Sequence, residues 1–472
     1  MRFLFAAIVI FPLLCAAQEG FKYGARVKSY SMYEPDRSFN ESYHTVFVNP
    51  EIKYFHKKFQ FVVSPAVTYS YIKDTNSFIQ SDFNYSGYGD QQYDYFFNET
   101  YVSYLNKSFS ARLGYFKYLF VTSDFLNPTR QLNSINTRYL FLGDKDEVEA
   151  TPAFDLACNY KGVVKIQLGI LPFHELSKPF DYHWLTRYDK EMYEKFSTDK
   201  WLRDGIEDSL DVPDQETVNL LVDAIGSEIA VRNTYEKWTG FKSMQYFGRL
   251  EMNFLSWQVN MMYAHLKPKL AVQKIISKQF FLFNLPDSIV FVYPAYYMYG
   301  LDFEKAIAEF SIRAEFAYNT MEYQVVSYNN DPDSVKDYSA ETSSLSWILG
   351  IDRFLPLNMY INLQFFHKHL FHYVDDAYNM KMENDYGLVA TLQKRADKDR
   401  LKFSVDNAYD FAFKDGMLSL SADASYIKNL KITIGARCFY NGKSDGSRYW
   451  SYGRFGSYAR NDHIFVLLKY YL

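Results

Sequence analysis

The sequence lacks three features that would point to common functional classes. Beyond its amino terminus, no stretch approaches the roughly eighteen consecutive apolar residues of a membrane-spanning helix. It has no block of basic residues, and its net charge of -4 comes from interspersed acids and bases, so we expect no nucleic-acid partner. Walker, Gly-x-Gly-x-x-Gly and Cys-x-x-Cys motifs are absent, and we expect no cofactor.

The amino terminus is typical of an export signal. Arg2 is followed by the apolar run 3–14 and by small residues at 15–17 that suit a signal peptidase. We therefore predict a signal peptide over 1–17 and a mature chain over 18–472.

Aromatic residues are abundant, and apolar residues are diluted by polar ones. Hydrophobic residues make up 48% of the chain and aromatic residues 19%, including 43 Tyr and 42 Phe. The mean hydropathy is nevertheless only -0.28. Tyrosine suits a surface that is apolar along its ring and wet at its tip, as at a membrane interface.

Alternating apolar and polar residues predict many amphipathic strands. In the clearest segment, Leu418, Leu420 and Ala422 alternate with serines and Asp423, and the last nine residues alternate similarly. Eighteen such segments begin near residues 21, 44, 58, 91, 108, 150, 163, 242, 256, 289, 307, 341, 357, 383, 400, 417, 430 and 460. We predict an all-β fold, an antiparallel transmembrane β-barrel of about 18 strands, with 16 as the alternative, and a polar interior.

The predicted connections alternate between short turns and long loops, which is the asymmetry of barrels in bacterial outer membranes. Short turns are expected at Lys161-Gly162, Glu304-Lys305 and Pro356, among others. The connection 174–237 is too long for a structureless loop, and its two amphipathic stretches predict a helical insertion in an extracellular loop.

Two cysteines, Cys158 and Cys438, remain after the predicted signal peptide. Both fall on the apolar phase of their strands, which should lie far apart around a barrel. We predict two free, lipid-facing thiols that act as small hydrophobic groups.

Four sequence blocks follow one another between residues 110 and 370. They are Asp124-Phe125-Leu126-Asn127-Pro128-Thr129, Ile170-Leu171-Pro172-Phe173, the pair Gly300-Leu301-Asp302-Phe303-Glu304 and Arg313-Ala314-Glu315-Phe316-Ala317-Tyr318, and Gly350-Ile351-Asp352. Together they resemble a family of porin-like outer-membrane proteins known mainly as a domain of unknown function. The resemblance implies a barrel and, for some members, work beside inner-membrane exporters of hydrophobic molecules. The chain departs from the pattern in its opening strands and at Leu472, where an aromatic residue usually ends the last strand.

Charged residues on the inward phases of the predicted strands are the candidate channel lining. They are Asp302, Arg313, Glu315, Asp352, Lys402, Asp406, Asp423 and Arg437. A wall of mixed charge would keep the interior wet and weakly selective. The same residues could instead form ion pairs that brace the barrel, and the two roles are compatible.

The segment with Asp124, Asn127, Pro128 and Arg130 is the candidate constriction loop. Asp and Asn-Pro favour a fixed turn through side-chain hydrogen bonds and the locked proline. The loop could fold inward, with Asp124 and Arg130 facing the path, or form a structural turn at the barrel rim.

Two other interpretations have less support. His367 and His369 share a strand face and could chelate a metal, but they continue an outward apolar phase and suit a membrane interface. If the turn centres on Pro356, Ser343 lies opposite His369, as in an outer-membrane phospholipase, yet no acidic or amide partner is evident on the same outward face. We expect neither a metal site nor an enzyme.

The predicted function is passage of solutes or amphipathic molecules across the bacterial outer membrane through a porin-like channel. The alternatives are a lipid exit channel partnered with an inner-membrane transporter, and a surface adhesin or scaffold that binds through 174–237. The other expected partners are outer-membrane lipids and the barrel assembly machinery.

Overall fold

In the part of the chain that it describes, the computed structural model is built almost entirely of strands. It describes residues 20–33, 42–72, 91–120, 127–136, 147–177, 230–233, 240–241, 243–269, 272–280, 283–325, 339–375, 382–441, 455 and 462–472. The predicted signal peptide and residues 178–229 and 234–237 of the predicted helical insertion lie outside these ranges. Within them, no helix has the length and apolar character needed to cross a membrane.

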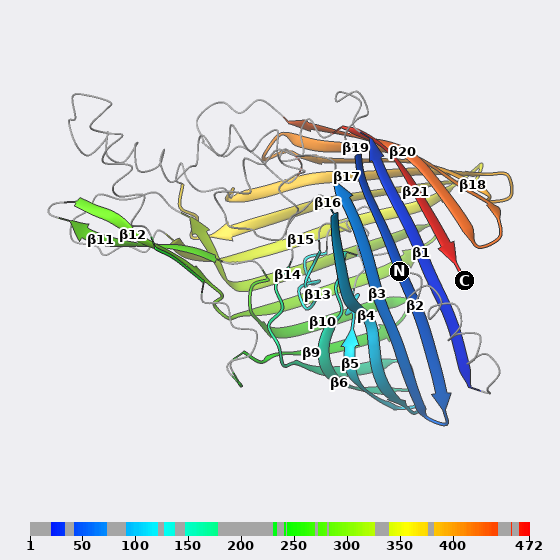
Figure 1. Cartoon of the computed structure of the whole chain (residues 1–472), viewed down its shortest axis with the longest axis horizontal. Helices are drawn as coiled ribbons and strands as arrows, with labels where there is room; N and C mark the ends of the chain where they lie inside the picture. Colours follow the sequence, from blue (N-terminus) through cyan, green and yellow to red (C-terminus); the bar gives the residue numbers. More distant parts are fainter. Residues whose placement is uncertain are drawn as a thin grey trace.

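Eighteen strands form one sheet that closes on itself, as predicted, because β1 pairs with β2 on one side and with β21 on the other (Figure 1). Every pairing between neighbours around this sheet is antiparallel. The barrel strands are β1 (Phe21–Tyr33), β2 (Ser42–His56), β3 (Phe59–Ile72), β4 (Gln91–Leu105), β5 (Phe109–Phe116), β6 (Thr151–Tyr160), β7 (Val164–Leu171), β9 (Gln245–Phe254), β10 (Trp257–Leu266), β13 (Tyr296–Ile307), β14 (Phe310–Val325), β15 (Ser339–Leu355), β16 (Met359–Phe371), β17 (Asn384–Ala396), β18 (Leu401–Asp410), β19 (Asp415–Ile427), β20 (Leu430–Asn441) and β21 (His463–Tyr471).

The alternation of residue types along each strand separates an apolar outside from a more polar inside. On β10, Met261 and Tyr263 are exposed outward, whereas Asn260 and Ala264 are buried on the inner face. Outward aromatic rings gather at both ends of the strands. Tyr263 and Tyr297 stack at the long-loop end with ring centroids 5.9 Å apart, and Phe59 and Tyr104 meet at the short-turn end at 5.3 Å. An apolar belt between two aromatic bands is the exterior that a bilayer requires.

The short turn between β13 and β14 lies at Ala308-Glu309, so the turn predicted at Glu304-Lys305 is wrong. The strands continue to Ile307 and Phe310, and Ala308 adopts a left-handed φ of 53°. Lys305 lies within β13 and faces outward at the barrel rim. Its ammonium group is 4.3 Å from the ring centroid of Trp257. A charge at the end of a membrane strand was therefore mistaken for a turn.

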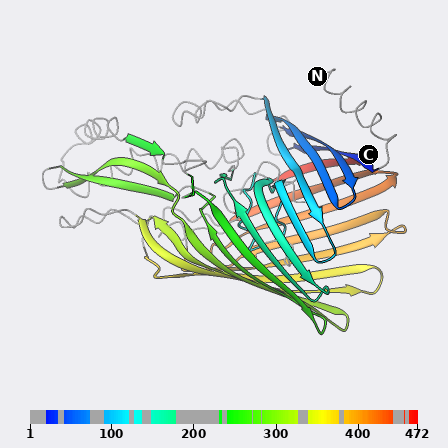
Figure 2. The ribbon, with the colours of Figure 1, turned by 90° about the horizontal axis from the view of Figure 1, so that it is seen from below.

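The strand predicted to begin near residue 289 covers the end of β12 and the start of the barrel strand β13. Residues Phe283–Val292 form β12, which pairs with β11 (Val272–Phe280) and, in parallel, with β8 (Ala230–Asn233). This three-stranded sheet extends away from one end of the barrel (Figures 1 and 2). The apolar residues at the end of β12 resemble those of a membrane strand, and the sequence alone does not distinguish a strand of this small sheet from a strand of the barrel.

Cys158 and Cys438 are free and exposed. Their backbones lie on β6 and β20, which are separated by many strands around the sheet. The prediction of two free thiols is confirmed.

The first testable prediction concerns the outer face. Leu420 points outward near the middle of β19, whereas the next residue, Ser421, points into the lumen. Replacing Leu420→Arg should lower the free energy of unfolding in bilayers by about 2–4 kcal/mol, because it places a charge in the lipid core. The matched Ser421→Arg variant, whose side chain meets water in the lumen, should lose less than about 1 kcal/mol. Equal losses in urea titrations of the two variants would contradict the assignment of the two faces.

Candidate functional site

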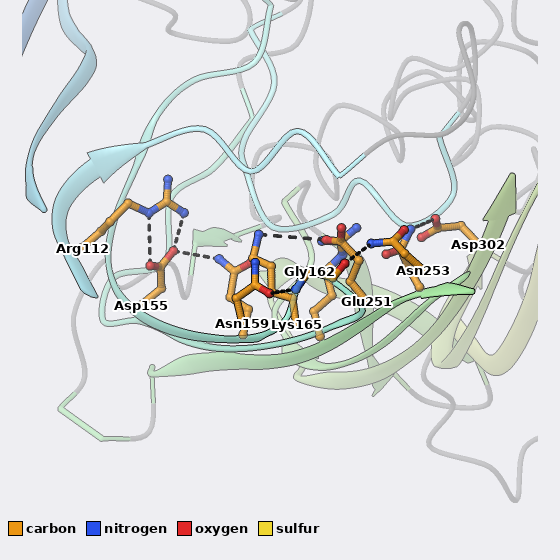
Figure 3. Close-up of polar contacts among 11 residues, drawn as sticks. Arg112, Asp155, Asn159, Gly162, Lys165, Glu251, Asn253 and Asp302 are labelled. Carbon is orange, nitrogen blue, oxygen red and sulfur yellow. Dashed lines mark hydrogen bonds and ion pairs between the residues drawn. The ribbon is translucent and has the colours of Figure 1, made fainter. Parts of the chain in front are cut away.

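The lumen is partly filled by the chain that follows β5. Barrels of about 16–18 strands leave an aqueous channel unless something occupies it. Residues 117–120 and 127–136, here called the inner loop, turn inward after Phe116 instead of extending β5. In Figure 3 the cyan ribbon of this segment passes above the wall strands on the lumen side. The inner loop therefore lies inside the barrel, where the sequence predicts a constriction.

The inner loop is packed onto the wall by apolar contacts. Tyr118 and Leu132 are buried in one cluster with Phe247 of β9, Leu266 of β10 and Met298 of β13. The rings of Tyr118 and Phe247 meet edge to face with centroids 4.9 Å apart. The cluster gives the inside of the barrel a core of its own, and burial of large side chains stabilises it by roughly 1.5–3 kcal/mol each.

A buried carboxylate anchors the loop on the side of the barrel formed by β13 and β14. Glu315 Oε1 accepts hydrogen bonds from the backbone N–H of Thr129 at 2.8 Å and from its hydroxyl at 2.7 Å, and Glu315 is fully buried. Hydrogen bonds to a charged acceptor contribute about 1.5–3 kcal/mol each. Glu315 is thus placed on the inner wall as the sequence phase predicts, but the loop covers it.

Two further features fit the loop to this wall. The hydroxyl of Tyr296 donates to Oε1 of Gln131 at 2.7 Å. Gly300, on the inner face of β13, has no room for a side chain, because a Cβ there would lie 2.9 Å from Cγ2 of Thr129. The glycine of the Gly-x-Asp-Phe-Glu block therefore makes space for the loop.

Side-chain hydrogen bonds fix the shape of the inner loop. The buried amide of Asn133 accepts from the N–H of Tyr118 at 2.7 Å and donates to the carbonyl of Glu149 at 2.9 Å. Arg130 N–H donates to the carbonyl of Asn127 at 3.1 Å, and the carbonyl of Pro128 accepts from Gln131 at 2.6 Å. The predicted turn around Asn-Pro is therefore part of a folded segment inside the barrel.

Arg130, one of the two charged residues of the candidate constriction, lies beside an acid of the same connection. Arg130 Nη1 lies 3.4 Å from Oε1 of Glu147, a residue of the same connection, and both side chains are largely covered. Asp124 lies outside the described residues. Whether Arg130 meets a passing solute stays a prediction.

Below the inner loop, the first sector of the wall carries linked acids and bases (Figure 3). Asp155 on β6 accepts from Arg112 on β5 at 3.1 and 2.5 Å and from Gln167 on β7 at 2.9 Å. On β13, Asp302 accepts from the amide of Asn260 at 2.5 Å and is buried. These side chains come from adjacent strands and brace the wall along the hydrogen-bonded rows.

The next sector is built around Arg313. Its guanidinium lies 3.4 Å from Glu304 and 3.2 Å from Asp352, which come from β13 and β15. One arginine therefore joins two carboxylates on neighbouring strands. Arg313 and Asp352, predicted separately for the lining, lie together.

The third sector holds the remaining predicted residues. Asp423 lies 3.1 Å from Lys402 and 2.9 Å from Lys431, and Asp406 accepts from the hydroxyl of Thr391 at 2.7 Å. Arg437 donates to the hydroxyl of Tyr30 at 3.1 Å. All lie on the inner face, where they serve as structural partners; a role in conduction stays a prediction.

Several charged inner-wall residues were not among those predicted to line the channel. Lys28 on β1 pairs in register with Lys469 on β21, which pairs with Lys431 on β20, so three lysines form one row across adjacent strands. Arg112 and Asp155 also belong to the lining. The inward phase of each strand could have identified all of these residues. The prediction included only some of the inward charged residues and left these out.

The register corrects the proposed Ser–His pair. Ser343 lies opposite Phe371, and His369 lies opposite Leu345, because the turn predicted at Pro356 spans residues 356–358 and centres on Leu357. His367 and His369 both contact Oδ1 of Asn384, at 3.2 and 3.0 Å, at the outward rim. No group of three potential metal ligands occurs among the described residues.

The loops above the wall meet at His174, outside the membrane strands. Its Nε2 lies 3.0 Å from the carbonyl of Pro268, and its ring contacts Tyr293 edge to face at 5.3 Å. Burial, and then the nearby Lys269 and Lys267, lower the pKa of His174 to about 4. Ser177 joins this junction to the inner loop, because its N–H donates to the carbonyl of Lys269 and its hydroxyl accepts from the N–H of Ile135.

Removing the buried anchor should loosen the inner loop. In Glu315→Ala, Thr129 loses its acceptor for two hydrogen bonds, and we expect single-channel currents in planar bilayers to become larger and noisier than those of the native protein. Asp406→Ala removes an inner-wall carboxylate that is bonded to Thr391 and is the matched control. Currents that change equally in the two variants would contradict an anchoring role.

The His174 junction should weaken in acid. Because its pKa is lower in the folded state than the ordinary value of 6.5, the unfolded form takes up a proton first, and stability is lost as pH falls from 6.5 to about 4. After correction for intrinsic rates, exchange of the Ser177 amide should be at least about tenfold faster at pH 4.5 than at pH 7. The His174→Gln variant should lose this pH dependence of exchange. If its exchange depends on pH as in the native protein, another group is responsible.

No known family model and no curated protein sequence matches this chain. Among solved structures, it is similar to OccD3 (OpdP) of Pseudomonas aeruginosa, at 8% identity and a TM-score of 0.48, with 96% of this chain and 91% of that chain covered. OccAB2 of Acinetobacter baumannii gives 8% identity and a TM-score of 0.47, over 96% and 97% of the two chains. The outer membrane protein opdK of Pseudomonas aeruginosa gives 7% and 0.47, over 96% and 99%.

Proposed function

We propose that this protein is a porin-like channel of the bacterial outer membrane, through which solutes pass along a lumen narrowed by the inner loop. The observation that carries the proposal is the closed 18-stranded sheet with an apolar, aromatic-bordered outside and acid–base groups inside. The fold has the outer surface of a membrane protein and an inner surface that water can solvate. No enzymatic group is needed for this role.

The wall suits small polar solutes of either sign. Arg112, Arg313 and Lys402 face the lumen beside Asp155, Asp352 and Asp423. Acids and bases lie beside one another in these sectors, and the lysine row on β1, β21 and β20 adjoins Asp423 through Lys431. Such a path solvates ions and dipoles but discriminates weakly between anions and cations.

Passage of amphipathic molecules is the second candidate, and apolar groups on the inner face favour it. Tyr30, Phe47 and Phe465 form a buried cluster on β1, β2 and β21, and Arg437 lies over the Phe465 ring at 4.2 Å. Another cluster contains Ile348 and Phe366. Together with the charged rows of the wall, these clusters offer an apolar and a polar surface to an amphipathic molecule. The alternative of a lipid exit channel requires both surfaces.

The experiment that tests the proposal is single-channel recording of the folded, full-length protein in planar bilayers. Discrete current steps would support a solute channel. Silence from a protein whose folded barrel is verified by heat-modifiable migration on gels would contradict an open channel. A deletion variant, with residues 178–229 replaced by a short linker, tests whether that segment limits the current or serves surface binding instead.

Charge neutralisation should locate the path. Arg313→Gln leaves Glu304 and Asp352 without their shared cation, so the cation-to-anion permeability ratio should rise severalfold. Lys402→Gln leaves Asp423 paired with Lys431, and the ratio should rise less. Reversal potentials in a salt gradient measure both; the opposite ranking would place the path away from Arg313.

A further inference from the structure

Basic and aromatic side chains form pairs around the short-turn end of the barrel. Distances from the charged group to the ring centroid are 5.9 Å for Lys58–Tyr104, 5.2 Å for Lys161–Tyr160, 4.3 Å for Lys305–Trp257, 4.8 Å for Arg353–Phe310 and 5.9 Å for Arg400–Tyr426. At separations of about 6 Å or less, a cation is attracted to the face of the ring. These pairs hold five cations at the rim.

The rings of these pairs belong to the outer face of the barrel. Trp257 lies directly opposite Lys305 in the pairing of β10 with β13, and Phe310 lies directly opposite Arg353 in the pairing of β14 with β15, so each pair shares one face. Tyr160 is 66% exposed at the outward end of β6. The pairs therefore border the apolar belt and not the lumen.

The pairs are distributed around the barrel. Lys58 lies in the turn between β2 and β3, and Arg400 lies in the turn between β17 and β18, with the other pairs between them along the chain. Further cations occupy the same turns, including Lys57, which adopts a left-handed φ of 54°. Among the described residues, the acidic side chains in the short turns are Glu309, Asp397 and Asp399, and Glu309 is already bound to Arg353.

We propose that this rim binds the phosphate headgroups of anionic phospholipids in the leaflet next to the short turns. Aromatic rings settle at the depth where acyl chains meet headgroups. A cation held over such a ring lies at the depth of the lipid phosphate, and its attraction to an anionic leaflet strengthens binding about fivefold per residue. The inference rests on the proposed membrane placement and adds a lipid class that the channel itself does not require.

The bound lipid is a structural partner and not cargo. Lys58, Lys161 and Lys305 face away from the inner loop and from the inner-wall ion pairs. Their neutralisation should leave the ion path intact. Lipid binding and conduction can therefore fail independently, and both can be measured on one preparation.

The test compares retention of phosphatidylglycerol and phosphatidylcholine by the full-length protein in nanodiscs or by native mass spectrometry. The native protein should prefer phosphatidylglycerol by at least about tenfold at low salt, and the Lys58→Gln/Lys161→Gln/Lys305→Gln variant should lose most of that preference. Lys414→Gln is the matched control, because Lys414 lies in the turn between β18 and β19, at the opposite end of the barrel. It should keep the preference.

Three outcomes would overturn the proposal. They are equal retention of the two lipids by the native protein, an equal loss in the Lys414→Gln control, and full displacement by inorganic phosphate at the same phosphate concentration. If the triple variant does not fold, a salt titration of the native protein decides. Preference for phosphatidylglycerol must then fall as salt screens the rim cations, and a salt-independent preference would contradict the proposal.

Discussion

Closure of the sheet is the constraint on which the rest of the structure depends. A membrane offers no water to backbone groups, so an open edge would leave a row of unpaired N–H and C=O groups in lipid. Here β21 returns to β1, with Tyr471 opposite Arg26 and Ile464 opposite Tyr33, and the last residue exchanges hydrogen bonds with Ala25. Because the ends meet in an antiparallel pair, the number of barrel strands must be even. Closure also fixes which face of every strand is inside.

The inner loop turns the inside of the barrel into a second core. In a soluble protein the apolar face of a sheet is buried, whereas here that face meets lipid and the inner face carries polar groups. The apolar cluster around Tyr118 and Phe247 is an exception, made possible because the chain after β5 folds back onto the wall. The buried Glu315 then serves Thr129 instead of water. The same mixed surface can hold a loop, solvate a polar path and accommodate an amphipathic molecule.

Sequence reasoning recovered the barrel because alternation is a local signal repeated in every strand. Leu420 and Ser421, for example, are adjacent in sequence and lie on opposite faces of the sheet, as their polarity predicts. Turn positions were less certain, as Lys305 illustrates, because a charge at the membrane interface and a charge in a turn have the same sequence signature. The sheet of β8, β11 and β12 was not predicted, because an apolar strand outside the barrel has the same sequence pattern as a strand within it.

The candidate site was only partly predictable, for a physical reason. Phase along a strand places Glu315 or Arg313 on the inner wall, but it does not show what covers each residue or which neighbour pairs with it. The contact between Thr129 and Glu315 joins residues separated by 186 positions. Such contacts depend on how a loop crosses the lumen, which no local pattern encodes. The Asn-Pro segment is a fixed turn inside the barrel and not at its rim, and its role as a constriction stays a prediction.

Disulfide trapping of the inner loop tests the central claim most directly. A Cβ at Gly300 would lie 3.7 Å from the Cβ of Thr129, which matches the spacing of a disulfide. In a chain with Cys158 and Cys438 replaced by serine, the Thr129→Cys/Gly300→Cys variant should cross-link readily in the folded, bilayer-embedded barrel. Its single-channel current should be the same before and after oxidation. Failure to cross-link, or a current that falls sharply when the bond forms, would show that the loop does not normally lie on this wall.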